Sequence, residues 1–173
     1  TKRDKILYSY SPISYITTDD QFHRLYTSTV DGKLNIYSID KMKHIMSLDI
    51  KSSAHKIIIT KSWGFILVYL YRKIILFSQN GIKIREITCI SNYTFLYPFD
   101  YHGLDFICYV DDLGKIGIFE AFNPYNVFET KVTNKDILSL CFYPENSCLL
   151  FLTKSGMISS VYVDILKFFS ITN

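Results

Sequence analysis

The residue types that could carry chemistry are sparse and scattered. Two acidic pairs, Asp19–Asp20 and Asp111–Asp112, could act as acid and base. Both occur where strands are expected to end, and there aspartate is favoured because its side chain bonds nearby backbone amides. Serine never occurs in a G-x-S-x-G motif, and the seven glycines form no phosphate-binding loop. The histidines, which show no metal-binding spacing such as H-E-x-x-H, are His23, His44, His55 and His102. We therefore expect no catalytic residue, no metal site and no cofactor.

The four cysteines, at positions 89, 108, 141 and 148, fit neither a paired C-x-x-C zinc site nor a dense disulfide framework. Free thiols in a cytoplasmic protein are expected. Only Cys141 and Cys148 could face each other across a hairpin. The longest uninterrupted apolar stretch, residues 65–71, is far shorter than the roughly 20 residues that span a bilayer.

The composition is that of a β protein. Of the 173 residues, 71 are β-branched or aromatic, whereas alanine, the best helix former, occurs twice. The 49% hydrophobic content is enough for one domain with a substantial core, which rules out disorder as the main state.

A repeat of about 41 residues organises the apolar segments. Residues 27–38 (TSTVDGKLNIYS), 109–120 (YVDDLGKIGIFE) and 151–162 (FLTKSGMISSVY) each read as strand, tight turn with glycine, strand. The turn residues Gly32, Gly114 and Gly156 are separated by 82 and 42 positions, and the skipped position 73 falls inside a similar pattern, VYLYRKIILF. The sequence therefore predicts four repeats.

Each repeat also has an apolar strand before its hairpin, and the first three have another after it, at residues 43–50, 82–89 and 127–132. Four antiparallel strands in 40 to 45 residues are typical of a β-propeller blade. We predict an all-β fold, a single WD-repeat-like β-propeller domain over residues 1–173, with blades of four strands at 11–50, 51–91, 92–133 and 134–173. Two-helix solenoid units are the alternative, but the glycine turns count against them.

Four blades would fill part of a larger ring, for which we expect seven blades. Residues 3–10 are predicted to form the last strand of a preceding blade. The final repeat runs through its third strand, so its fourth could come from an earlier part of a longer protein, from a second copy, or from residues 165–171.

The hairpins resemble WD repeats, residues 27–40 most closely. Tyr37 stands where that family has tryptophan, and Phe119 and Glu120 stand at its Trp-Asp position in the third repeat. The family's Gly-His pair and a true Trp-Asp dipeptide are missing. The resemblance implies the blade, without the side-chain hydrogen-bond tetrad of a typical WD blade.

Two stretches resemble the carboxy-terminal propeller of BEACH-domain proteins, the beige and neurobeachin-like family. The S-x-N-G turn of that family matches Ser78, Asn80 and Gly81. Its final blade matches Gly156, Ile158, Val163 and Asp164. The resemblance implies a large cytosolic scaffold, peripherally associated with membranes, in vesicle trafficking. A generic degenerate WD-repeat propeller is the alternative.

Charge is unevenly distributed along the chain. Residues 1–86 carry 14 Lys and Arg against 7 Asp and Glu, whereas residues 87–173 carry 5 against 9. The basic half could face an acidic partner or anionic lipid headgroups, although lysines also protect strand edges from aggregation. A net charge of +3 with no nucleic-acid-reading motif argues against nucleic acid as a partner.

We expect a non-catalytic protein-interaction scaffold whose partners are other proteins or the remaining blades of the same protein. Binding of anionic membrane lipid through the basic half is an alternative. Repeat equivalence places one group of candidate contact residues on a shared rim: Lys33, Arg72, Lys73, Asp111, Lys115 and Lys154. Trp63 is either an exposed anchor for a partner or a plug beneath a neighbouring blade.

Overall fold

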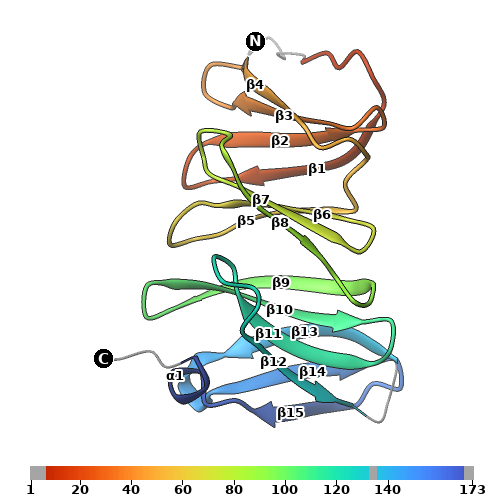
Figure 1. Cartoon of the computed structure of the whole chain (residues 1–173), viewed down its shortest axis with the longest axis vertical. Coiled ribbons are helices and arrows are strands. Elements are labelled where there is room, and N and C mark those ends of the chain that lie inside the picture. Colours follow the sequence, from red (N-terminus) through yellow and green to blue (C-terminus); the bar gives the residue numbers. More distant parts are fainter. Residues whose placement is uncertain (1–6, 133–135, 170–173) are drawn as a thin grey trace, which may run out of the picture. The chain divides into compact units, whose positions relative to one another are not determined.

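A computed structural model describes residues 7–132 and 136–169 (Figure 1). Strands dominate this part of the chain, and the predicted all-β fold is confirmed. Helical structure in the described residues is restricted to the single 3₁₀ turn η1 (Pro144–Asn146) and the single α-helical turn α1 (Ile165–Phe168).

The strands form four antiparallel sheets, and strands that are consecutive along the chain are neighbours in each sheet. The first sheet contains β1 (Ile13–Asp19), β2 (Arg24–Thr29), β3 (Lys33–Ser38) and β4 (Lys43–Asp49). The second contains β5 (Lys56–Ile59), β6 (Ile66–Leu70), β7 (Lys73–Phe77) and β8 (Lys83–Thr88). The third contains β9 (Tyr93–Tyr101), β10 (Leu104–Asp111), β11 (Lys115–Glu120) and β12 (Val127–Lys131). The fourth contains β13 (Ile137–Tyr143), β14 (Cys148–Thr153) and β15 (Ile158–Tyr162). Each sheet lies within one of the four predicted blade segments.

The chain divides into two compact units of two sheets each. Unit 1 comprises residues up to 59 together with 64–88, and its two sheets pack through one apolar core. That core includes Tyr26, Leu34 and Ile36 from the first sheet and Ile66, Val68 and Phe77 from the second. Because inner strands such as β6 are buried along their whole length, they read as continuous apolar runs.

Unit 2 comprises residues 60–63 together with 89 onward, and its core joins the third and fourth sheets. Phe106, Cys108 and Ile118 from one sheet meet Leu140 and Phe151 from the other. The fourth strand of each complete sheet alternates between exposed and half-buried residues, as in β12, because one face of an edge strand meets water. All four cysteines are free, so the hairpin pair Cys141 and Cys148 forms no disulfide.

The fourth sheet has three strands in the described residues, as expected for a last repeat that runs through its third strand. Residues 165–168, considered as a fourth strand, form α1 instead. Asp164 caps this turn by accepting a hydrogen bond from the Lys167 amide, and Ile165 is buried in the unit 2 core. Residues 170 and 171 lie outside the described part of the chain.

The predicted strand at residues 3–10 is only partly covered, since residues 1–6 lie outside the described part of the chain. Residues 7–10 are irregular rather than a strand. A strand here would need the other strands of a preceding blade as partners, and among the described residues the first sheet begins with β1.

Candidate functional site

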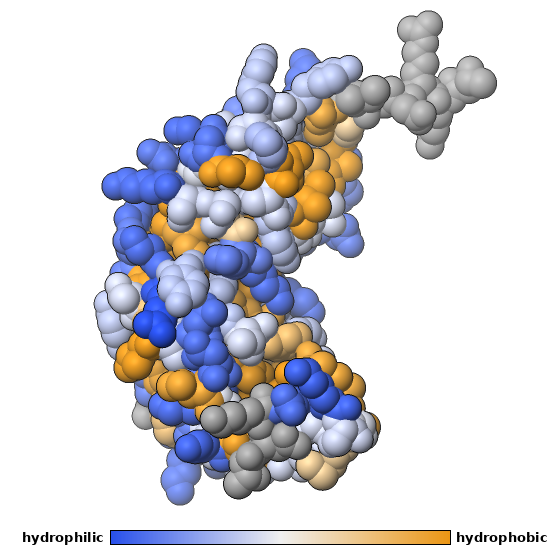
Figure 2. All heavy atoms as spheres, turned by 90° about the vertical axis from the view of Figure 1, so that its right-hand side faces the viewer, coloured by the Kyte–Doolittle hydropathy of each residue, from blue (hydrophilic) through white to orange (hydrophobic). Residues whose placement is uncertain are grey.

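The predicted contact residues all lie at the hairpins between the second and third strands of the sheets. Lys33, Arg72 and Lys73 belong to unit 1, whereas Asp111, Lys115 and Lys154 belong to unit 2. Within each unit the two hairpins point to the same side of that unit (Figure 1). Figure 2 faces this side and shows many hydrophilic side chains with hydrophobic ones between them.

Three of these hairpins share the same turn at atomic detail. In each, the residue that ends the second strand accepts a hydrogen bond from the turn glycine: Gly32 to Thr29, Gly114 to Asp111 and Gly156 to Thr153. The side chain of that first residue then accepts a bond from the backbone amide after the glycine, at 3.2, 2.8 and 3.2 Å respectively. All three glycines have positive φ, which glycine adopts at little cost. In the second sheet a shorter turn, Tyr71–Arg72, replaces this motif, and Arg72 takes the positive φ.

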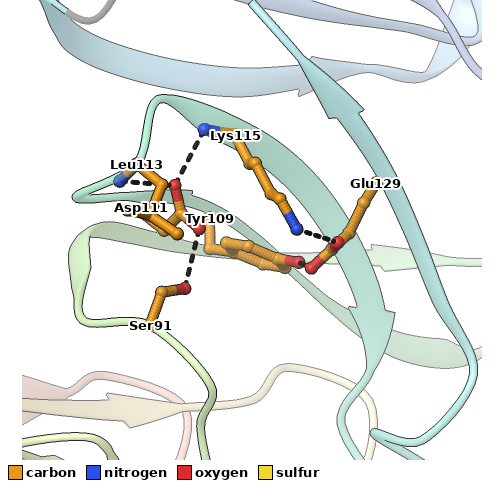
Figure 3. Close-up of polar contacts among 6 residues, drawn as sticks. All are labelled: Ser91, Tyr109, Asp111, Leu113, Lys115 and Glu129. Carbon is orange, nitrogen blue, oxygen red and sulfur yellow. Dashed lines mark hydrogen bonds and ion pairs between the residues drawn. The ribbon is translucent and has the colours of Figure 1, made fainter.

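Asp111 is the exception among the predicted contact residues, because it is only 3% exposed. Its Oδ1 accepts from the amides of Leu113 and Lys115 at 3.0 and 2.8 Å, and its Oδ2 accepts from the Ser91 hydroxyl at 2.7 Å (Figure 3). The prediction that Asp111 contacts a partner is therefore wrong. A buried carboxylate must be satisfied by hydrogen bonds, and here those bonds fix the turn.

The hairpin lysines of unit 2, Lys115 and Lys154, are paired with acids of their own sheet or the adjoining connection. Lys115 Nζ lies 3.0 Å from Glu129, and Lys154 Nζ lies 3.4 Å from Asp136. Glu129 raises the pKa of Lys115 through this hydrogen bond. Exposed pairs of this kind contribute little stability, but they reduce the positive charge that the hairpins offer to a ligand.

Unit 1 contains the strongest of these pairings. Glu86 on β8 lies 2.7 Å from Lys73 Nζ and also pairs with Lys83. Hydrogen bonds from Lys73 and then Lys83 lower the pKa of Glu86 to about 2. The guanidinium of Arg72 lies over the Tyr71 ring, 5.7 Å from its centroid. The basic residues at this hairpin are thus engaged locally.

A second polar contact lies on the same sheet as Asp111. Tyr109 is fully buried and its hydroxyl donates to Glu129. Burial, and then this hydrogen bond, raise the pKa of Tyr109 well above its usual range. Tyr109 also stacks with Tyr93 at 4.4 Å between ring centroids. Glu129 thus joins Tyr109 and Lys115 across β10, β11 and β12 (Figure 3).

One serine and one histidine approach each other in unit 1. His44 Nε2 lies 2.8 Å from Ser47 Oγ, and Ser47 donates its hydroxyl proton to Asn35 Oδ1 at 2.6 Å. The pair lines an open cavity of about 430 Å³ that also includes Tyr8, Tyr10 and Tyr37. Since the serine proton points to Asn35, His44 is the donor in its bond with Ser47. A catalytic serine needs the histidine as acceptor, so this arrangement does not activate Ser47.

Within residues 7–132 and 136–169, no group of three or more His, Cys, Asp or Glu side chains is placed to hold a metal ion. Among the same residues, no helix has the length and apolar character needed to cross a membrane.

Trp63, for which the sequence left two roles open, lies at the side of unit 2 opposite these hairpins. Trp63 is 61% exposed, so it is an exposed side chain rather than a plug. The Asp105 carboxylate, on a residue only 4% exposed, accepts hydrogen bonds from the amides of Ser62 and Trp63 at 2.8 and 2.9 Å. The Trp63 indole N–H donates to the Gly103 carbonyl at 3.2 Å.

Asp105 was missed by the sequence reasoning, although a repeat signal marks its position. The backbone amides of Ile39, Ala121 and Val163 bond the carbonyls of the repeat-equivalent residues His23, Asp105 and Ser147. Asp105 is distinguished because it is acidic, whereas the equivalent residues of the other two repeats are a histidine and a serine.

The sequence matches no protein-family model and no curated protein. Solved structures do share its fold. The computationally designed Ika4 protein matches at TM-score 0.67 and 11% identity, over 92% of this chain and 96% of that one. BBS1N, solved in complex with ARL6DN, matches at TM-score 0.68 and 14% identity, over 89% of this chain and 52% of that one. A streptogramin B lyase matches at TM-score 0.59 and 14% identity, over 89% and 55%.

These similarities show the fold: the chain is an all-β protein of the β-propeller type, and its four sheets are blades. It spans about half the length of BBS1N and of the lyase. The same fold thus occurs in an enzyme and in a protein solved with a protein partner.

Proposed function

We propose that this chain is a non-catalytic protein-interaction scaffold, a cytoplasmic propeller portion that presents connecting turns to partner proteins. The observation that carries the proposal is the turn shared by three hairpins, in which a Thr or Asp side chain at a repeat-equivalent position bonds the backbone. Turns held in this way lose little conformational entropy when a partner binds. The similarity to BBS1N, solved in complex with ARL6DN, supports a role in protein interaction.

We further propose that the chain belongs to a BEACH-like protein of vesicle trafficking. The S-x-N-G segment supports this, since it forms the turn between β7 and β8. Ser78 accepts bonds from the Gly81 and Ile82 amides, and Gly81 has a φ of 78°. A generic WD-repeat adaptor is the alternative family context.

Proximity labelling in cells tests the scaffold role. The chain is fused to a biotin ligase and compared with the ligase alone. We expect enrichment of a defined set of proteins, including components of vesicle membranes. A labelled set identical to that of the ligase alone would overturn the proposal.

Binding of anionic lipid is the competing function, and the lysine pairing on Glu86, Glu129 and Asp136 argues against it. Flotation with vesicles of phosphatidylcholine and phosphatidylserine at low salt separates the two. The scaffold proposal predicts that the chain stays with the unbound fraction. Salt-sensitive flotation that is lost when Lys33 and Arg72 are both changed to alanine would favour the lipid function instead.

A further inference from the structure

Trp63 combines wide exposure with a fixed position. Its backbone amide and that of Ser62 are held by one buried carboxylate, and its indole N–H is held by a backbone carbonyl. Burying a carboxylate is costly unless hydrogen bonds compensate it. In return, Asp105 orders a segment whose largest side chain remains 61% exposed. The bonds therefore fix the place of an exposed aromatic ring.

Two further exposed aromatic side chains lie in the connection after β11. The start of this connection is hydrogen-bonded to the backbone of Asp105. The Asp105 carbonyl accepts from the Ala121 amide at 2.8 Å, and Phe122 comes next. Phe122 is 49% exposed, and Tyr125 in the same connection is 71% exposed. Aromatic side chains of this kind are enriched in the centres of protein interfaces. We call Trp63, Phe122 and Tyr125, with the carboxylate of Asp100, the Trp63 surface.

The charge at this side of unit 2 is acidic. Asp100 is exposed and lies opposite Asp105 in the pairing of β9 with β10, while Glu120 ends β11 opposite Phe106. The same side, at the left in Figure 1, includes the ends of the fourth sheet and α1. Its described acidic residues are Asp100, Asp105, Glu120, Glu145 and Asp164, and its described basic residues are Lys61 and Lys167. Anionic lipid or nucleic acid would be repelled here, whereas a cationic partner would be attracted.

We propose that the Trp63 surface docks a basic segment of a partner protein, with Trp63 as the central anchor. Arginine or lysine side chains would lie over the aromatic rings and near the carboxylate of Asp100. This inference rests on the proposed scaffold function and names its surface and the chemistry of its partner.

Selection from a phage library of random 12-residue peptides tests the inference on the 173-residue chain. We expect the selected peptides to be enriched in Arg and Lys together with apolar residues. Because Trp63 is the single tryptophan of the chain, its fluorescence reports binding directly. Trp63→Ala removes this fluorophore, so its binding is measured by titration calorimetry; it should weaken binding of a selected peptide about 30-fold, the loss typical of a central interface residue.

Two variants and one control make the result specific. Asp100→Asn retains the aromatic rings and should weaken binding less, while making it less sensitive to salt. Tyr71→Ala, which removes a ring of 64% exposure from the β6–β7 hairpin, should leave binding unchanged. Thermal melting checks that each variant remains folded.

The failures are distinguishable. If peptides bind but are not basic, or bind Trp63→Ala as tightly as the unmodified chain, the inference that the Trp63 surface docks a basic segment is wrong. The proposed scaffold function then still stands. If no peptide of any composition binds, the inference is overturned and the scaffold function loses support with it.

Discussion

Tyr109 lies directly across Gly117 in the pairing of β10 with β11, and its ring occupies the space that a side chain at position 117 would need. A Cβ built on Gly117 would come within 2.6 Å of both Tyr109 Cζ and Oη, and within 2.6 Å of the Phe128 carbonyl oxygen. The glycine thus allows the tyrosine hydroxyl to reach Glu129 on β12.

Gly117→Ala should lower the free energy of unfolding by about 2–3 kcal/mol, because the added methyl group overpacks a site bounded by backbone. Urea denaturation measures the loss. Gly103→Ala is the control, since its Cβ meets nothing within 4 Å and only the positive φ is strained. That control should cost about 1 kcal/mol. A cost at Gly117 no greater than at Gly103 would contradict the close packing.

Asp111→Ala should cost about 2–3 kcal/mol, because it leaves the buried Ser91 hydroxyl and the amides of Leu113 and Lys115 without their acceptor. The adjacent Asp112 is exposed and provides a matched control, for which Asp112→Ala should change stability by less than about 0.5 kcal/mol. Equal effects of the two substitutions would show that the turn does not depend on the Asp111 carboxylate. Chemical denaturation of both variants in parallel makes the comparison.

Stability should fall at alkaline pH through Tyr109. Burial and the bond to Glu129 raise the pKa of Tyr109 above its ordinary 10.0, so the unfolded state loses this proton first. The contribution is complete below about pH 10 and is lost as the pH rises beyond it. Tyr109→Phe should weaken this dependence in melts from pH 8 to 11, leaving the part due to Tyr15, Tyr26 and Cys89, whose pKa values burial also raises. An unchanged pH profile would argue against the buried hydroxyl.

Glu86 should make a contribution to folding stability that is lost at acidic pH. Its pKa falls from 4.5 to about 2 through the hydrogen bonds of Lys73 and Lys83, so its contribution is present above pH 4.5 and disappears as the pH falls toward 2. Glu86→Gln should flatten this part of the acid profile. The effect should be small and should vanish near 1 M salt, because the side chain is 35% exposed. Identical acid melting of the two proteins would rule out this ion pair as a source of stability.

The repeat could be predicted from the sequence because turns that need a positive φ place glycine at regular intervals along the chain. Gly32, Gly114 and Gly156 occupy equivalent turns, as their spacing indicates. The β-branched composition likewise predicted sheets, since short apolar runs such as β6 fit strands buried on both faces.

The contact residues could not be predicted as well, because repeat equivalence places a backbone position but not a side chain. Asp111 and Lys115 belong to the same turn, yet one is buried as the acceptor of three bonds and the other is exposed in an ion pair. Asp105 was missed for a similar reason, since its role depends on a segment 42 residues earlier in the chain. Residues 165–171 were one of three sources considered for the last strand of the fourth blade, whereas the Asp164 cap favours a helical turn at residues 165–168.

Time-resolved fluorescence anisotropy of Trp63 tests most directly whether this chain presents contact residues in fixed positions. We predict that Trp63 rotates with the whole protein, with little fast depolarisation, and that Asp105→Ala introduces a fast component because the amides of Ser62 and Trp63 lose their acceptor. Fast nanosecond depolarisation of Trp63 in the unmodified chain, unchanged by Asp105→Ala, would contradict the account.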